Sequence, residues 1–177
     1  VLPFSDRQLL IESTMISTQL EDRDWYLQAM IEWLETQNIE IEETLREETG
    51  VIPMDAITPV DSNIACIGAA SGAVRLSSGY AFTGIQAQIA KLARGISAGD
   101  FTVPAPISPG LIRMDRIFNA VLMAQPELGP SIMMRTAKAL NGDGFARFML
   151  GSATIADWAR VILAMPKMPF LKQVWRL

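Results

Sequence analysis

The hydrophobic and polar positions predict that the chain begins with short strands and one helix. Apolar residues over 1–4 and 7–16, separated by Ser5 and Asp6, predict two extended segments joined by a turn. Early acidic residues followed by an apolar stripe at helical spacing predict a helix over 22–37. Alternating apolar and acidic residues over 38–49 predict a half-buried strand.

The middle of the chain has the pattern of a strand, a glycine-rich turn and a helix. A short apolar strand is predicted over 63–67, and it runs directly into a turn over 68–79 that is rich in glycine. The apolar spacing that follows predicts a helix over 80–94. Gly95 is expected to end this helix, because glycine readily takes the left-handed conformation of a C-terminal cap.

The last part of the chain is predicted to be helical. Three prolines within 101–110 indicate a linker, and a break is expected at Gln125 and Pro126. A turn is predicted over 141–144, and another helix is expected to start at Thr154. No apolar run reaches the length that is needed to span a bilayer. The predicted buried stripe of the helix that starts at Thr154 consists of Ile155, Trp158, Ala159 and Ile162.

The composition limits the chemistry. Half of the 177 residues are hydrophobic, so a packed core is expected rather than disorder. The sequence has no histidine and one cysteine, Cys66, which excludes histidine-based triads and an internal disulfide. A zinc site is nearly excluded for the same reason, and no metal site is predicted. A single cysteine fits a reducing, cytoplasmic compartment. Acid–base work falls to carboxylates, tyrosine, lysine or a cofactor.

The net charge of −4 hides an asymmetry between the two parts of the chain. Residues 1–60 hold 13 acidic and 3 basic side chains, a balance of −10, whereas residues 61–177 hold 6 acidic and 12 basic ones, a balance of +6. The basic part is compatible with an ordinary solvated surface or with a face that rests on anionic lipid headgroups. The acidic total and the lack of basic–aromatic clusters argue against a nucleic-acid partner.

Two features can carry chemistry. Glycines where a strand meets a helix let the backbone approach a flat or charged ligand, and the helix start offers free N–H groups to a phosphate or a flavin ring. The alternative is a tight junction without a ligand. The second feature is Glu12, which stands among apolar strand residues. It either faces solvent or, in an apolar pocket, has a raised pKa and serves as an acid or base.

Several segments, taken in this order, resemble lycopene cyclases, which are flavoproteins of carotenoid synthesis. These are residues 1–5 with 10–14, the stretch 68–82, and the helical end at 147–149 and 165–170. The resemblance covers most of the chain. It implies an enzyme of the isomerase type that closes the linear end group of lycopene into an ionone ring without net oxidation or reduction.

The resemblance also implies the fold. The chain is expected to be α+β, a fragment of an α/β FAD-binding Rossmann-like flavoprotein whose dinucleotide-binding motif lies upstream of Val1. Residues 1–60 are expected to form part of the substrate-binding sheet, and residues 61–100 a C-terminal piece of the FAD-binding domain. Residues 101–177 form a helical C-terminal region in this prediction.

The implied catalytic residue is Glu12. The sequence Leu10-Ile11-Glu12-Ser13-Thr14 aligns with the Phe-Leu-Glu-Glu-Thr motif of the plant enzymes, so that Glu12 matches the first glutamate and Ser13 replaces the second. Glu12 is therefore predicted to give or take the proton of the cyclisation.

The implied cofactor is FAD in its reduced form, with NAD(P)H as its reductant. Where related flavoproteins often carry an aspartate that holds the ribityl chain, this chain has Ala69, a change that lycopene cyclases often share. The residues predicted to bind the cofactor are Gly68, Ala69, Gly72, Ser78, Gly79 and Tyr80.

The expected partner is a hydrophobic carotenoid, which suggests peripheral contact with the inner face of the membrane. Basic residues near Phe170, Leu171 and Trp175 can rest at such an interface, or these apolar side chains simply pack on the core. Two alternatives stay open: another flavoprotein of the superfamily, such as a prenyl-chain reductase or a monooxygenase-like protein, and a non-catalytic lipid-binding relative.

Overall fold

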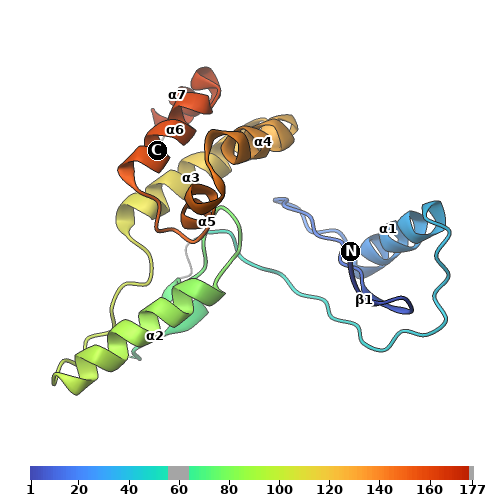
Figure 1. The fold of residues 1–177 in the computed structure, drawn as a ribbon, viewed down its shortest axis with the longest axis horizontal. Helices are drawn as coiled ribbons and strands as arrows, with labels where there is room; N and C mark the ends of the chain where they lie inside the picture. The colour runs from blue at the N-terminus through green and yellow to red at the C-terminus, as the bar shows by residue number, and fades with distance from the viewer. Residues whose placement is uncertain (56–63, 176–177) are drawn as a thin grey trace. The chain divides into compact units, whose positions relative to one another are not determined.

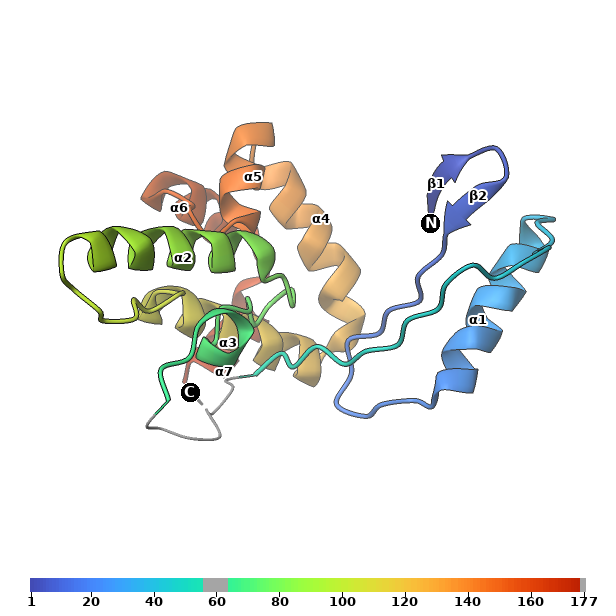
Figure 2. The ribbon, with the colours of Figure 1, turned by 90° about the horizontal axis from the view of Figure 1, so that it is seen from below.

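A computed structural model describes residues 1–55 and 64–175, which fall into two compact units, Val1–Val51 and Ile52–Leu177. The described chain is mostly helical with one small antiparallel sheet, so the predicted α+β class is confirmed at that level (Figures 1 and 2). The elements are strands β1 (Leu2–Ser5) and β2 (Gln8–Leu10), helices α1 (Arg23–Thr36), α2 (Phe82–Ser97), α3 (Pro109–Ala124), α4 (Gly129–Ala139), α5 (Gly142–Met149), α6 (Ile155–Ala164) and α7 (Lys167–Val174), and 3₁₀ turns η1 (Gly68–Ser71) and η2 (Pro126–Leu128).

The first unit contains a β-hairpin and one helix, as predicted. Strands β1 and β2 pair antiparallel with Leu2 opposite Leu10, but β2 ends there, so the strand is shorter than the predicted 7–16. Helix α1 starts directly after Asp22, whose carboxylate accepts a hydrogen bond from the Trp25 N–H. This acceptor satisfies one of the free donors at the helix start and fixes where α1 begins.

The strand predicted over 38–49 is wrong. This stretch is irregular and exposed, although it carries the expected alternation. Alternating side chains form a strand only where a neighbouring strand completes the hydrogen bonds, and in the described residues β1 and β2 pair only with each other. The stretch is instead tied to its own unit by exposed ion pairs, Arg7 with Glu42 at 2.7 Å and Arg23 with Glu47.

The second unit begins with the glycine-rich turn and α2. The strand predicted over 63–67 is wrong for Ile64–Ile67, which are irregular, and Asn63 lies outside the described residues. Gly95 does not end α2 either, since the helix runs on to Ser97. Gly99 takes the left-handed conformation, with φ of 83°, while the amides of Gly99 and Asp100 donate to the carbonyls of Ile96 and Gly95. This pair of bonds is a Schellman cap one turn beyond the predicted position.

Helices α3 to α7 build the hydrophobic core. The prolines of the predicted linker precede α3, except that Pro109 itself opens the helix and Ser108 caps it by accepting from the Leu111 N–H. The predicted break at Gln125 and Pro126 is confirmed. Helix α3 contacts α7, and α4 contacts α6. The buried cluster between these helices consists of Val121, Ile132, Leu140, Val161 and Met165.

Two predictions for the helical end are wrong. The turn predicted over 141–144 is the start of α5, because the Asn141 side chain accepts from the Gly144 N–H and caps that helix. Helix α6 starts after Thr154, as predicted, but it does not bury the predicted stripe, since Ile155 is 90% exposed and Ile162 is 49% exposed. The buried residues of α6 are Asp157 and Val161.

Within residues 1–55 and 64–175, none of the helices is both long and apolar enough to cross a membrane.

Candidate functional site

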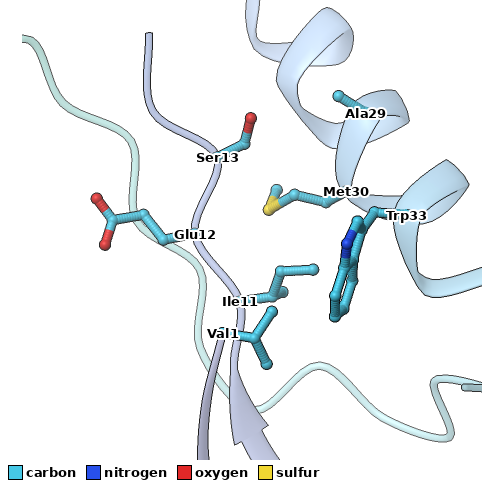
Figure 3. A pocket seen from close by; sticks show the side chains of 7 residues that line it. All are labelled: Val1, Ile11, Glu12, Ser13, Ala29, Met30 and Trp33. Atoms are coloured by element: carbon cyan, nitrogen blue, oxygen red, sulfur yellow. The ribbon is translucent and has the colours of Figure 1, made fainter. Parts of the chain in front are cut away.

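The first candidate site is an open hollow of about 370 Å³ in the first unit, between the segment after β2 and helix α1. Its apolar wall is formed chiefly by Ile11, Met30 and Trp33, whose side chains turn toward one another (Figure 3). Met30 and Trp33 are three residues apart on α1, a spacing that places them on one face of the helix. The full lining is Val1, Ile11, Glu12, Ser13, Ala29, Met30 and Trp33.

Glu12 borders this hollow but is not aimed into it. Ile11 and Ser13 lie on the side of the hollow, while the Glu12 carboxylate points away from Met30 and Trp33 (Figure 3). Successive side chains of an extended segment point to opposite sides, which explains this alternation. Glu12 is exposed, and its carboxylate accepts a hydrogen bond of 2.7 Å from the Thr14 hydroxyl. Of the two motif positions, therefore, it is Ser13 that faces the apolar wall.

The second candidate site is the glycine-rich turn between residues 68 and 80, in the second unit. Gly68, Gly72 and Gly79 have φ of 66°, 84° and 69°, values that side chains with a Cβ rarely adopt. A Cβ on Gly79 would also stand 2.9 Å from Ile52 Cγ2. The glycines of this turn are therefore required by its backbone path, whether or not a ligand binds.

A buried glutamine on α2 holds the start of this turn. Gln88 is 1% exposed, and its side-chain oxygen accepts a hydrogen bond of 2.9 Å from the Gly68 N–H. Its Nε2 donates to the Pro104 carbonyl at 2.9 Å and lies 3.0 Å from the Ser71 hydroxyl. One side chain thus joins η1, α2 and the proline linker. Beside it lies a second open hollow of about 330 Å³, lined by Ile64, Cys66, Ser71, Gln88, Val103, Pro104, Ala105 and Pro106.

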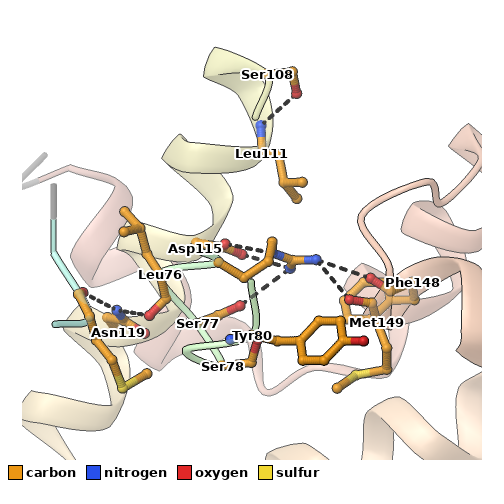
Figure 4. A network of polar contacts seen from close by, with 12 residues as sticks. Leu76, Ser77, Ser78, Tyr80, Ser108, Leu111, Asp115, Asn119, Phe148 and Met149 are labelled. Carbon is orange, nitrogen blue, oxygen red and sulfur yellow. Dashed lines mark hydrogen bonds and ion pairs between the residues drawn. The ribbon is translucent and has the colours of Figure 1, made fainter. Parts of the chain in front are cut away.

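A buried ion pair holds the end of the turn. Arg75 donates through Nε and Nη2 to the two oxygens of Asp115 on α3, at 2.8 and 2.9 Å (Figure 4). Its Nη1 lies 3.3 Å from the carbonyl oxygens of Phe148 and Met149 at the end of α5. Both charged side chains are at most 10% exposed. Since a buried guanidinium needs acceptors for its N–H groups, this set of partners fixes the turn against α3 and α5.

A third polar contact fastens the same turn to α3. Asn119 donates through Nδ2 to the carbonyls of Leu76 at 2.7 Å and Met54 at 3.1 Å (Figure 4). Its Oδ1 is buried and has no hydrogen-bond partner among the described residues. The Leu76 carbonyl of the turn and the Met54 carbonyl before it thus both accept from one α3 side chain.

Part of the turn is open to solvent. Ala69, Ser78 and Tyr80 are exposed, and no atom lies within 4 Å of the position a Cβ on Gly72 would occupy. Helix α2 starts without a side-chain cap, so its first N–H groups are not satisfied by a capping side chain. The amide of Gly68, by contrast, is already bound to Gln88. The predicted cofactor residues all belong to this one turn, but the Gly68 amide is already bonded within the protein.

Glu12 belongs to the first unit and the predicted cofactor residues belong to the second, so each set is defined only within its own unit.

The residues that sequence reasoning missed are Gln88, Asp115 and Asn119. A signal for Gln88 was present: a polar residue stands three positions after Ile85 and four before Leu92, inside an apolar stripe. In the part of the chain that the structure describes, no three carboxylate or cysteine side chains gather as a metal site would require.

Comparison with known proteins identifies the family of the chain. The family described as Lycopene cyclase protein matches residues 1–174, nearly the whole chain, and the chain belongs to this family. That family is generally associated with flavin. No curated protein and no solved structure matches the chain.

Proposed function

We propose that the chain acts as part of a flavin-dependent lycopene cyclase, which closes the linear end group of lycopene into an ionone ring. The observation that carries the proposal is the family match over residues 1–174, which includes the Glu12 segment and the glycine-rich turn. A cyclase of this kind performs an isomerisation. It therefore needs a proton donor and acceptor and an apolar site, and it consumes no electrons.

The atoms balance in three steps. A proton adds to the terminal double bond of the end group, and the neighbouring double bond attacks the resulting carbocation to form the ring. Loss of a different proton restores neutrality. We assign the proton transfer to the Glu12 carboxylate, because it is the acidic group that borders the apolar hollow of Ile11, Met30 and Trp33. These apolar side chains would hold the hydrocarbon and exclude water.

The flavin would be held by Ala69, Gly72, Ser78, Gly79 and Tyr80, with Gly68 shaping the backbone before them. When bound in its reduced form, with NAD(P)H as reductant, it would supply electron density that stabilises cationic character. The chain's own contribution is to keep the turn rigid through Gln88 and Arg75. The Rossmann-like parent domain and a cytoplasmic location belong to this proposal as well.

One observation favours a second candidate, a non-catalytic lipid-binding relative. Glu12 is exposed, bonded to Thr14 and turned away from the hollow, and the hollow itself is open. Such a carboxylate keeps its hydration, whereas protonating an alkene requires a strong acid in a dry site. In this alternative the same apolar wall binds a hydrocarbon chain and Glu12 is a surface residue.

The test expresses the gene at its full length in cells that accumulate lycopene, with Glu12→Gln and the matched control Glu21→Gln beside it. Glu21 is an exposed glutamate of the same unit. Cyclic carotenoid with the wild type and the control, but not with Glu12→Gln, is the expected result. Ring formation that survives Glu12→Gln would move the proton transfer elsewhere. Unchanged lycopene with flavin bound would point to another flavoprotein reaction, and unchanged lycopene without flavin to the lipid-binding relative.

A further inference from the structure

Helix α6 has two apolar faces, and only one of them is covered. Its inner face contributes Val161 to the core, and Ala164 packs against the same cluster. Its outer face, defined here as Ile155, Ala156, Ala159, Ile162 and Leu163, is exposed. These positions follow the spacing i, i+1, i+4, i+7 and i+8, which is that of a continuous stripe along one side of a helix.

The outer face of α6 is strongly exposed for a set of aliphatic side chains. Ile155 is 90% exposed, Leu163 is 75% exposed and Ile162 is 49% exposed. Single exposed apolar residues are ordinary, but a stripe of them on one helix marks a surface that contacts something other than water. The length of α6, about 15 Å for its 10 residues, suits a helix lying in the plane of a membrane interface.

The exposed charges in the segment that contains α6 are positive. Between Leu150 and Trp175 the one carboxylate is Asp157, which is 1% exposed and paired with Arg147 and, at 3.8 Å, with Arg160. The same stretch carries Arg160, Lys167 and Lys172, all exposed. An apolar stripe with cations and without exposed carboxylates is the chemistry that anionic phospholipids recognise.

Two cations are fixed at the C-terminal end of α6. The Lys167 ammonium donates to the carbonyls of Ile162 and Leu163, and Arg135 Nη1 donates to the carbonyl of Ala164 at 3.1 Å. Both charges therefore lie at the C-terminal end of α6. Both cations also stabilise the negative end of the α6 helix dipole. This structural role does not require a lipid.

We propose that the outer face of α6 is the surface by which this protein rests on an anionic lipid bilayer. The terminal segment takes a smaller part than its composition suggests, because Phe170 packs against the core, whereas Trp175 is 88% exposed. The proposal does not depend on the cyclisation, since a non-catalytic lipid-binding relative would use the same surface.

The test measures binding of the chain to sedimented vesicles made of equal parts phosphatidylglycerol and phosphatidylcholine, and to vesicles of phosphatidylcholine alone. The variant Ile155→Gln/Leu163→Gln removes the two most exposed residues of the outer face. Its matched control is Met123→Gln/Phe101→Gln, which changes side chains that are 68% and 75% exposed elsewhere in the same unit. Circular dichroism establishes that both variants keep the wild-type helix content.

The expected result is binding to the anionic vesicles that falls roughly tenfold or more in the outer-face variant and stays within about twofold in the control. Arg160→Gln should weaken binding to the anionic vesicles more at low salt than at high salt, because salt screens the attraction. Equal binding of the outer-face variant and its control would overturn the proposal, and so would equal binding to both kinds of vesicle. Dimers that form without lipid and disappear in the outer-face variant would instead assign this face to a second copy of the chain.

Discussion

Arg75 and Asp115, 40 residues apart in the sequence, form a two-bond ion pair of 2.8 and 2.9 Å that joins the glycine-rich turn to helix α3. The same guanidinium reaches the carbonyls at the end of α5, so one side chain connects three segments of the second unit. The rigidity of the predicted cofactor turn therefore comes from outside the turn. Loss of this ion pair should lower the free energy of unfolding and weaken the binding of any ligand to the turn.

Arg75→Met is expected to lower the free energy of unfolding by about 3–5 kcal/mol, because it leaves the Asp115 carboxylate buried without its partner. The double variant Arg75→Met/Asp115→Leu should recover part of that loss, since no buried charge remains unpaired. Urea unfolding followed by circular dichroism measures both. Arg113→Met, on the exposed side of the same helix, is the control. An Arg75→Met effect no larger than the control's would show that the pair does not hold the turn.

Gln88→Leu should destabilise the second unit by about 2 kcal/mol or more, because the Gly68 amide and the Pro104 carbonyl lose their buried partner. Gln88→Glu keeps an acceptor for Gly68 but loses the donor to Pro104 and adds a buried charge, so it should not rescue stability. Hydrogen exchange of the Gly68 amide gives a local readout. If the Gly68 amide is protected equally in Gln88→Leu and in the wild type, its hydrogen bond to Gln88 is contradicted.

The stability of the helical end should depend on acid pH through Asp157. Hydrogen bonds from Arg147, and then from the Thr154 amide and hydroxyl, hold the pKa of this carboxyl well below its usual range. A lowered folded-state pKa stabilises the fold fully above the unfolded value of about 3.9, and this contribution is lost as pH falls through the folded pKa.

Asp157→Asn should therefore be less stable than the wild type at neutral pH, and the difference should shrink as the pH is lowered below about 4. Thermal melts across an acid pH series measure it, with Glu127→Gln, an exposed carboxyl on η2, as the control. A difference between wild type and Asp157→Asn that stays constant down to strongly acid pH would rule out this linkage.

The cap of α2 gives a paired glycine test. Gly99→Ala should cost about 1–2 kcal/mol, because Gly99 has φ of 83° and any Cβ is strained there. Gly110→Ala should instead stabilise by about 0.4–1 kcal/mol, since this residue lies in α3 with nothing within 4 Å of an added Cβ. Melting temperatures that move in the same direction for both variants would show that backbone conformation does not decide the outcome.

The sequence by itself determined the elements whose signals are local. Asp22 at the start of α1, Pro126 between two helices and Thr154 before α6 each act on the few residues around them, and the structure confirms all three. The family, too, was recognisable from short segments taken in order along the chain.

Only the tertiary structure decided which neighbours those local signals meet. The alternation over 38–49 forms no strand because the described residues offer it no partner, and α6 buries Asp157 and Val161 while Ile155 stays exposed. Arg75 and Asp115, or Gly68 and Gln88, are each distant in sequence, and nothing local links them. The physical reason is the same in each case: burial and pairing depend on which surfaces meet when the chain packs, and periodicity along one segment does not contain that information.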